Sequence, residues 1–279
     1  MIDAHQHFWT LARGDYGWLS PEDVVLYRDF APDDLAPLIE QAGITRTVVV
    51  QAAPTLDETR YLLDLAECSS FVAGVVGWVD LEGAEVVETL DSLASHALFC
   101  GVRPMIQDIA DDDWMLGGAL SAGLRALCER SLSFDALVLP RHLPRLLRLL
   151  ERHPDLRVVI DHAAKPEIAA GRFDAWAEDM AQLARQTGAS CKLSGLVTEA
   201  AKAWRPADLR PYVEHLLECF GAERVMWGSD WPVVELAGGF ERWREASLGL
   251  LEALGDAESA AILGGNAARF YGLGEEGLV

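Results

Sequence analysis

Two histidines stand one residue apart near the start of the chain, in the run Ile2-Asp3-Ala4-His5-Gln6-His7-Phe8-Trp9. Alternate residues of a β-strand point to the same face, so His5 and His7 would project together from one strand end. Neutral imidazole is a common ligand for zinc, and it also holds water by hydrogen bonds. The spacing alone fits equally with two polar residues on a half-buried strand, so the interpretation depends on further groups.

A carboxylate and a third histidine follow later apolar runs. Asp230 comes after Met226-Trp227-Gly228-Ser229, and His162 comes after Val158-Val159-Ile160-Asp161. A carboxylate at the end of an apolar strand is partly desolvated and needs a partner, a metal or a proton to handle. Asp230 is therefore the strongest catalytic candidate, although it could instead cap the segment near Pro232. Asp161 is either an inward ligand or a buried anchor, because alternation forbids Asp161 and His162 from facing the same way.

Cations and aromatic residues also follow the predicted strands. Arg103 and Lys165 are suited to polarising a carbonyl group or fixing an oxygen-rich ligand. His142 follows the predicted fifth strand, and a site role and a structural role both remain open for it. Aromatic rings can wall a pocket or belong to the ordinary core, and four tryptophans are in question: Trp18, Trp78, Trp204 and Trp231. His96, His153 and His215 fall on or beside predicted helices and are expected to be structural or solvated.

Apolar β-branched runs that alternate with helical patterns position these groups. The expected strands are the opening run and residues 47–51, 72–79, 98–102, 134–139, 156–161, 190–193 and 224–227. The expected helices are 32–41, 56–68, 84–97, 116–130, 143–152, 173–187, 209–220, 240–254 and 257–270. About eight strands, nearly all followed by a helix, predict an α/β protein with a (β/α)₈ TIM barrel, as a single domain over 1–279. Active-site groups of such barrels lie at the carboxyl ends of the strands.

Two segments depart from this alternation. Residues 10–29 are rich in aromatic residues without clean periodicity, and we expect a long loop over a strand end, in the position of a lid. Asp111, Asp112 and Asp113 are expected to form a solvated loop and helix cap rather than a metal site.

The composition narrows the class of partner. A net charge of -21 disfavours nucleic acid and anionic membranes, which require basic patches. The five cysteines are dispersed without C-x-x-C spacing, so we expect neither a disulfide framework nor a thiolate zinc site. The sequence shows neither a signal peptide nor an apolar run long enough to span a bilayer, and we expect a cytoplasmic protein. The oligomeric state is left open.

Three motifs together resemble the amidohydrolase superfamily, in its amidohydrolase-2 branch. They are His5-x-His7, Asp161-His162-x-x-Lys165-Pro166 and Gly228-Ser229-Asp230-Trp231-Pro232. With the Tyr16-Gly17-Trp18-Leu19 loop, the second motif looks most like the sugar lactonases that act on L-fuconolactone or L-rhamnonolactone. The pyronedicarboxylate lactonases resemble the chain more distantly.

The resemblance implies a hydrolase of carbohydrate metabolism that opens an aldono-lactone to the aldonic acid. Asp230 would take a proton from water and return it to the leaving ring oxygen, with His162 beside it. It implies either no required cofactor or one divalent zinc ion, whose ligands would be His5, His7, His162 and Asp230. A two-metal site is not expected, because the central strands supply no bridging Lys or Glu. The substrate would contact Arg103, Lys165, Trp18, Trp78, Trp231 and His142.

Two alternatives remain. A metal-dependent decarboxylase of an aromatic or unsaturated carboxylic acid shares the His-x-His pair, the later histidine and the late aspartate. A barrel that binds a sugar acid without turnover belongs to another class, and the intact set of His5, His7, His162 and Asp230 argues against it.

Overall fold

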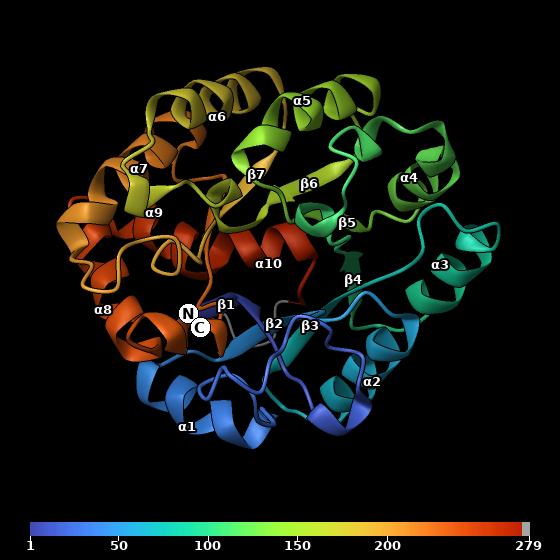
Figure 1. Ribbon diagram of the computed structural model, residues 1–279, viewed down its shortest axis with the longest axis horizontal. Coiled ribbons are helices and arrows are strands. Elements are labelled where there is room, and N and C mark those ends of the chain that lie inside the picture. Colours follow the sequence, from blue (N-terminus) through green and yellow to red (C-terminus); the bar gives the residue numbers. More distant parts are fainter. Residues whose placement is uncertain (275–279) are drawn as a thin grey trace.

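The centre of the computed structural model, which describes residues 1–274, is an eight-stranded parallel sheet with strands in sequence order (Figure 1). The strands are β1 (Ile2–Gln6), β2 (Arg46–Val50), β3 (Val72–Gly77), β4 (Phe99–Val102), β5 (Ser133–Ala136), β6 (Arg157–Ile160), β7 (Ser190–Leu193) and β8 (Val225–Trp227). Just beyond β8, the Asp230 amide donates to the His5 carbonyl at 2.8 Å, and the His7 amide donates to the Trp231 carbonyl at 2.7 Å. These bonds close the sheet into a barrel and bring its first and last strands together.

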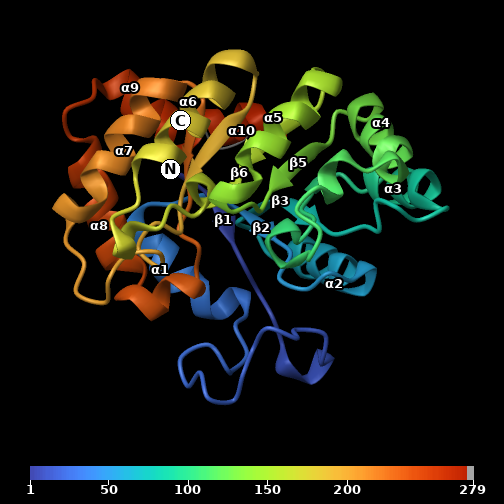
Figure 2. The same ribbon diagram turned by 45° about the horizontal axis from the view of Figure 1, so that its top comes forward.

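Residues 10–29 form the expected loop after β1, with one short 3₁₀ turn at Leu11–Arg13. Trp9 and Phe30 exchange backbone hydrogen bonds of 3.0 and 2.9 Å, which pin the base of the loop. Figure 2 shows this segment projecting from one end of the barrel. Because it starts where β1 ends, it lies at the end of the barrel where active sites of this fold occur.

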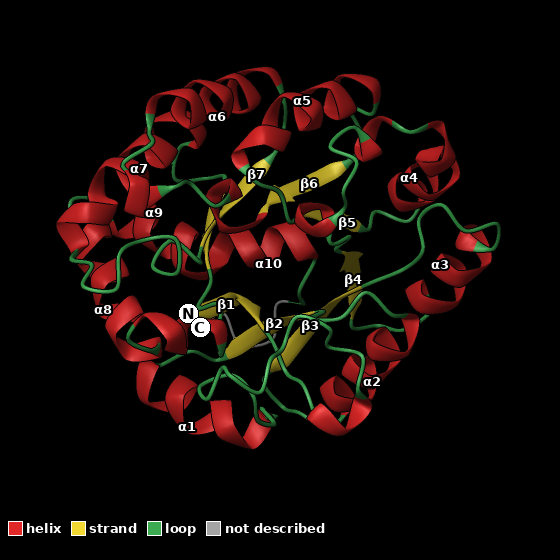
Figure 3. Ribbon diagram, in the orientation of Figure 1, coloured by secondary structure: helices red, strands yellow, loops and turns green. Residues whose placement is uncertain are grey.

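Helices follow the strands and surround them (Figure 3). They are α1 (Pro32–Ala42), α2 (Leu56–Glu67), α3 (Val86–Ala94), α4 (Ser121–Glu129), α5 (Leu143–Arg152), α6 (Asp174–Gln186), α7 (Pro206–Phe220), α8 (Phe240–Leu251), α9 (Asp256–Ala260) and α10 (Asn266–Tyr271). The predicted (β/α)₈ TIM barrel is confirmed. The longest helix of the described residues, α7, has 15 residues, and no helix there has the length and apolar character to cross a membrane.

The last predicted helix, 257–270, is interrupted. A π segment at Ala261–Gly265 separates α9 from α10, and Gly264 within it has non-helical backbone angles. A Cβ at Gly264 would lie 3.2 Å from the Ile2 amide nitrogen, so a larger residue would press on the start of β1. The break directs α10 to the barrel, where Ala267 and Tyr271 pack against apolar side chains of the strands.

Candidate active site

The carboxyl ends of the strands surround a cavity of about 200 Å³. Six predicted site residues line it: His7, Trp18, Arg103, His162, Lys165 and Asp230. The other lining residues are Ala52, Met105, Gln107, Asp108, Leu137, Thr198 and Val233. His5 lies directly behind His7, with ring centroids 4.8 Å apart. The structure therefore collects residues from across the whole chain at one site.

Asp230 faces three imidazoles. Its Oδ1 lies 3.4 Å from His7 Nε2 and 3.8 Å from the Nε2 atoms of both His5 and His162. The backbone of Asp230 adopts a left-handed conformation (φ 59°), which turns its side chain inward just after the strand. A Cβ at Gly228 would lie 2.7 Å from His5 Cβ, so the close approach of β8 to β1 requires glycine there. The contact with His5 thus explains the glycine at position 228, and the left-handed backbone explains how Asp230 turns into the site.

Backbone and hydroxyl groups fix the orientation of two imidazoles. His7 Nδ1 donates to the Val50 carbonyl oxygen at 2.7 Å, since a carbonyl can only accept. His162 Nδ1 lies 2.9 Å from Ser194 Oγ, which can donate or accept. Both rings therefore direct Nε2 toward Asp230. Ring orientation set by the distal nitrogen is the usual arrangement for histidines that hold water or metal.

The electrostatics of the site favour an ionised carboxylate among neutral imidazoles. Burial lowers the pKa of His7, and it lowers the pKa of His5 and of His162 well below the usual 6.5. Burial alone would raise the pKa of Asp230, but positive charge on His162 and His7, in their protonated forms, and on Lys165 outweighs burial and lowers that pKa from 3.8. Asp230 is therefore available to accept a proton at neutral pH.

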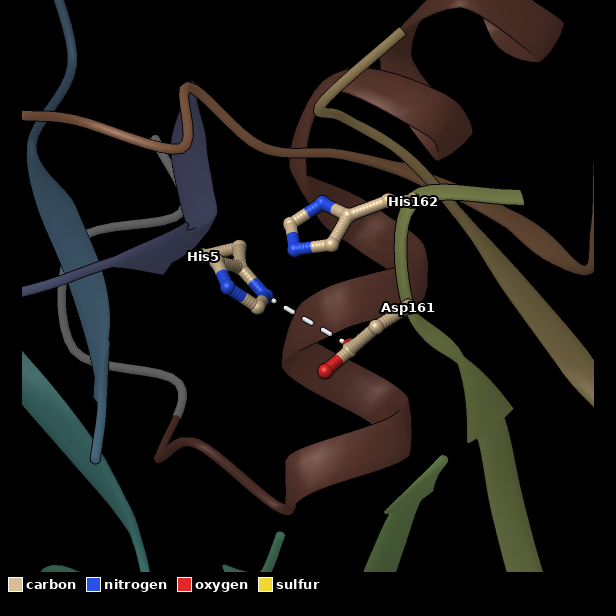
Figure 4. Close-up of side chains that lie close together, drawn as sticks. All are labelled: His5, Asp161 and His162. Atoms are coloured by element: carbon tan, nitrogen blue, oxygen red, sulfur yellow. Dashed lines mark ion pairs between the residues drawn. The ribbon is translucent and has the colours of Figure 1, made fainter. Parts of the chain in front are cut away.

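Asp161 and His162 both lie beside His5 but are placed differently: His162 lines the cavity, whereas Asp161 does not (Figure 4). The chain turns left-handed at His162 (φ 52°), which ends the strand alternation at that residue. Asp161 Oδ1 lies 3.4 Å from His5 Nδ1, and its Oδ2 lies 3.7 Å from Arg103 Nη1. Asp161 is completely buried beneath the histidines.

The two predicted cations reach the cavity. Arg103 donates from Nη2 to the Gln51 carbonyl, and Gln51 Nε2 donates back to the Arg103 carbonyl at 2.7 Å. This exchange ties the ends of β2 and β4 together and holds the guanidinium over the site. Lys165 lines the cavity from the left-handed turn that follows β6. The pair supplies local positive charge in a strongly acidic protein.

Trp18 also reaches the cavity, and its indole Nε1 donates to the Ala52 carbonyl at 2.7 Å. The structure does not bring the other predicted aromatic residues there. Trp78 borders a separate hollow, and Trp204 and Trp231 are buried in the core, with Trp231 against Phe8 and Phe30. Sequence position after a strand did not reveal which way these rings turn.

His142 is likewise outside the cavity lining. It is completely buried and its Nε2 lies 3.1 Å from Asp112 Oδ1. Its Nδ1 accepts from the Leu139 amide at 3.1 Å. These contacts tie the 104–114 segment to the start of α5, a structural arrangement.

Comparison with known proteins follows this geometry. A family model described as amidohydrolase matches residues 2–273. The chain belongs to this amidohydrolase family. It is 49% identical over 276 residues to an L-fucono-1,5-lactonase of Burkholderia ambifaria, covering 97% of this chain and 94% of the relative. It is 38% identical to an L-fucono-1,5-lactonase of Burkholderia multivorans, covering 98% and 96%.

A solved amidohydrolase structure from Burkholderia multivorans with bound zinc has a TM-score of 0.92 to this chain. The two are 37% identical, and the match covers 98% of this chain and 99% of the other. These findings confirm the resemblance drawn from the three motifs.

The donor atoms of this amidohydrolase site fit a single zinc ion in type. Two sets of buried side chains each place three ligand atoms within 4.8 Å of one another: His5, His7 and Asp230, and His5, Asp161 and His162. Catalytic zinc sites are built from histidine nitrogen and carboxylate oxygen. When bound, such an ion polarises a carbonyl group or lowers the pKa of a water.

Two charged residues of this site were missed in the sequence. Lys192 on β7 is completely buried, and its Nζ lies 2.6 Å from Asp135 Oδ2, 3.0 Å from Asp161 Oδ1 and 3.1 Å from His5 Nδ1. Asp135 on β5 also accepts from the Tyr271 hydroxyl of α10 at 2.6 Å. Burial lowers the pKa of Lys192, but Asp135 and Asp161 raise it more, so the ammonium form is kept.

A signal for Lys192 and Asp135 was present in the sequence. Each is a charged residue within a short run predicted to be a strand buried on both faces. Because an isolated buried charge is very costly, two opposite charges on such strands indicate partners across the barrel.

Proposed function

We propose that this amidohydrolase is a sugar lactonase that opens an aldono-lactone, with L-fucono-1,5-lactone as the first candidate, to the aldonic acid. The observation that carries the proposal is the buried Asp230 carboxylate, which faces three imidazoles beside two cations in a small cavity. The curated relatives, each described as an L-fucono-1,5-lactonase, support this substrate class.

In the proposed reaction, Asp230 removes a proton from a water molecule as the water oxygen bonds to the lactone carbonyl carbon. Asp230 can act as this base because its lowered pKa keeps it ionised at neutral pH and the fold holds it in place beside the cavity. The carbonyl electrons move onto oxygen and give a tetrahedral oxyanion. When they return, the bond between the carbonyl carbon and the ring oxygen breaks, and Asp230 gives its proton to that oxygen.

The oxyanion requires stabilisation in the cavity. Lys165 and Arg103 are the cations that line it, and both are held by the backbone geometry described above. Charges positioned in advance in a site shielded from water stabilise developing negative charge more than water does. We assign this role to Lys165 in particular, because the Arg103 guanidinium is also engaged with Gln51 and Asp161.

The neutral substrate and the anionic product differ in their attraction to this protein. A sugar lactone carries no charge, whereas the aldonate produced at neutral pH does. The chain has a net charge of -21, so its field favours departure of the product into solvent. Trp18 supplies an aromatic surface for the apolar face of the sugar ring.

Proton release in weakly buffered solution tests the proposal. Purified protein would be mixed with a panel of aldono-lactones, and the rate without enzyme would be subtracted. Acidification above background with L-fucono-1,5-lactone or a related sugar lactone supports the lactonase. No acidification with any lactone, together with release of carbon dioxide from an aromatic acid, would replace it with the decarboxylase.

A further inference from the structure

The Lys192 ammonium group lies beside three polar atoms at the floor of the site: it makes hydrogen bonds with Asp135 and His5 and an ion pair with Asp161. The ammonium nitrogen faces Asp135 Oδ2 at 2.6 Å, Asp161 Oδ1 at 3.0 Å and His5 Nδ1 at 3.1 Å, and the side chain is completely buried. An ammonium group donates three hydrogen bonds and accepts none. Because Lys192 can only donate, its 3.1 Å hydrogen bond with His5 Nδ1 requires a lone pair on that nitrogen.

His5 Nε2, on the opposite side of the ring, has two neighbours: Arg103 Nη1, which can only donate, at 3.4 Å, and His7 Nε2 at the shorter distance of 3.1 Å. His7 Nδ1 donates to the Val50 carbonyl at 2.7 Å, so a neutral His7 has its lone pair at Nε2. His5 Nε2 lies 3.1 Å from His7 Nε2. Two lone pairs at that distance would repel, whereas a proton on His5 Nε2 makes a hydrogen bond.

His5 Nδ1 has one competing neighbour. Asp161 Oδ1 lies 3.4 Å away and could accept from a protonated Nδ1, but it already faces the Lys192 ammonium at 3.0 Å. A proton on Nδ1 would also point at that ammonium group. The two arrangements of the ring proton thus have different partners. Lys192 and the lone pair of His7 support the proton on Nε2, at 3.1 Å each, whereas Asp161 and Arg103 support it on Nδ1, at 3.4 Å each.

We propose that Lys192 is a positioning residue that fixes His5 as the Nε2–H tautomer. In this state His5 presents a hydrogen-bond donor to the cavity rather than a lone pair. If His5 Nε2 were to hold a zinc ion, the ring proton would have to be on Nδ1, where Asp161 is the available acceptor. Lys192 therefore opposes the use of His5 as a zinc ligand, and Asp161 favours it. The proposal holds whichever lactone is the substrate.

Nitrogen NMR of the histidine rings tests the tautomer without reference to activity. Protein labelled with ¹⁵N-histidine and freed of metal by chelation would be examined through two-bond couplings between ring nitrogens and carbon-bound protons. A His5→Gln variant identifies the His5 signals by their loss. We expect a neutral His5 with its proton on Nε2 and a neutral His7 with its proton on Nδ1. A His5 proton on Nδ1, or a doubly protonated His5, would overturn the proposal.

Variants then test whether Lys192 determines the tautomer of His5. Lys192→Met is combined with Asp135→Asn, so that removal of the cation does not leave Asp135 as an unpaired buried charge. We expect zinc to bind this double variant at least tenfold more tightly than wild type in competition with a chromophoric chelator. Asp135→Asn alone, which keeps Lys192, is the matched control and is expected to retain the wild-type tautomer.

An unchanged zinc affinity and an unchanged His5 tautomer in the folded double variant would contradict the role of Lys192. If the double variant does not fold, the wild-type spectrum still decides the tautomer. Asp161→Asn tests the opposite effect, because it removes the carboxylate that accepts from a proton on His5 Nδ1. It is expected to weaken zinc binding relative to wild type.

Discussion

Asp230 Oδ1 lies 3.4 Å from His7 Nε2, although the two residues belong to opposite ends of the chain. They meet because the barrel closes between β1 and β8 through backbone hydrogen bonds at His5 and His7. Asp3 reinforces the seam, since its Oδ1 accepts from the Ser229 amide at 2.8 Å and the His5 amide at 3.1 Å. Formation of the site is thus coupled to completion of the fold.

The pH dependence of hydrolysis follows from the ionisation of this cluster. The pKa of Asp230 is held below 3.8, and the pKa values of His5, His7 and His162 are lowered from 6.5. The active protonation state is therefore populated from weakly acidic pH upward. We expect kcat/KM to be flat between pH 6 and 8 after subtraction of spontaneous hydrolysis. A steep loss of kcat/KM on acidification within that range would contradict the assignment.

Lys165 provides a direct test of oxyanion stabilisation. Lys165→Gln removes the positive charge from the cavity while retaining a polar side chain of similar reach. We expect kcat to fall roughly 100-fold, the scale seen when one oxyanion donor is removed. Lys202→Gln, the same substitution at an exposed position, is the matched control and should keep the wild-type kcat. Equal rates for the two variants would remove Lys165 from the mechanism.

Trp18 tests the contribution of the 10–29 loop to substrate binding. Trp18→Ala removes an aromatic surface that is 43% exposed at the cavity, together with its hydrogen bond to the Ala52 carbonyl. KM is expected to rise roughly fivefold to tenfold with a smaller change in kcat, because the ring contacts the sugar rather than the reacting carbonyl. Tyr27→Ala, on the same loop and 41% exposed, is the control for general loosening of the loop. If both variants raise KM equally, the loop acts as a whole and Trp18 has no special role.

Glu58 makes stability depend on pH. Its carboxylate accepts from the Ala52 and Ala53 amides at the end of β2, and burial raises its pKa from 4.5 to about 7. Because the pKa is higher in the folded state, uptake of a proton by Glu58 adds to the free energy of unfolding. This contribution is present in full below pH 4.5 and is lost as the pH rises through 7. The loss amounts to roughly 3 kcal/mol.

Glu58→Gln should therefore flatten the dependence of unfolding free energy on pH between 5 and 7, measured by urea denaturation. The exposed Glu88→Gln serves as its control and should keep the wild-type slope. A slope unaltered by Glu58→Gln would show that Glu58 does not take up a proton on folding.

The barrel could be predicted from the sequence because parallel strands buried on both faces are apolar and recur at regular spacing. His5, His7, His162 and Asp230 could be placed for the same reason, since each follows such a run. The direction of side chains beyond the strand ends could not be predicted, because it depends on how the backbone turns there. The left-handed turn at His162 brings Asp161 and His162 to one site.

The remaining side-chain positions depend on contacts between segments that are distant in the sequence. Trp231 turns into the core against Phe30, and His142 turns toward Asp112, although both follow strands as the cavity residues do. Lys192 on β7 becomes part of the site because Asp161, at the end of the neighbouring strand β6, and Asp135, on β5, lie within 3.0 Å of its ammonium nitrogen. A charged residue within an apolar strand indicates that it has a buried partner of opposite charge, but it does not identify that partner.

Kinetics of Asp230→Asn test most directly whether Asp230 activates the water that opens the lactone. The variant keeps the shape of the side chain but cannot accept the proton. For L-fucono-1,5-lactone, the account predicts that kcat/KM falls roughly 10²- to 10⁴-fold relative to wild type. Asp80→Asn, an exposed carboxylate near the end of β3, should leave it unchanged. Wild-type kcat/KM in a correctly folded Asp230→Asn protein would contradict the account.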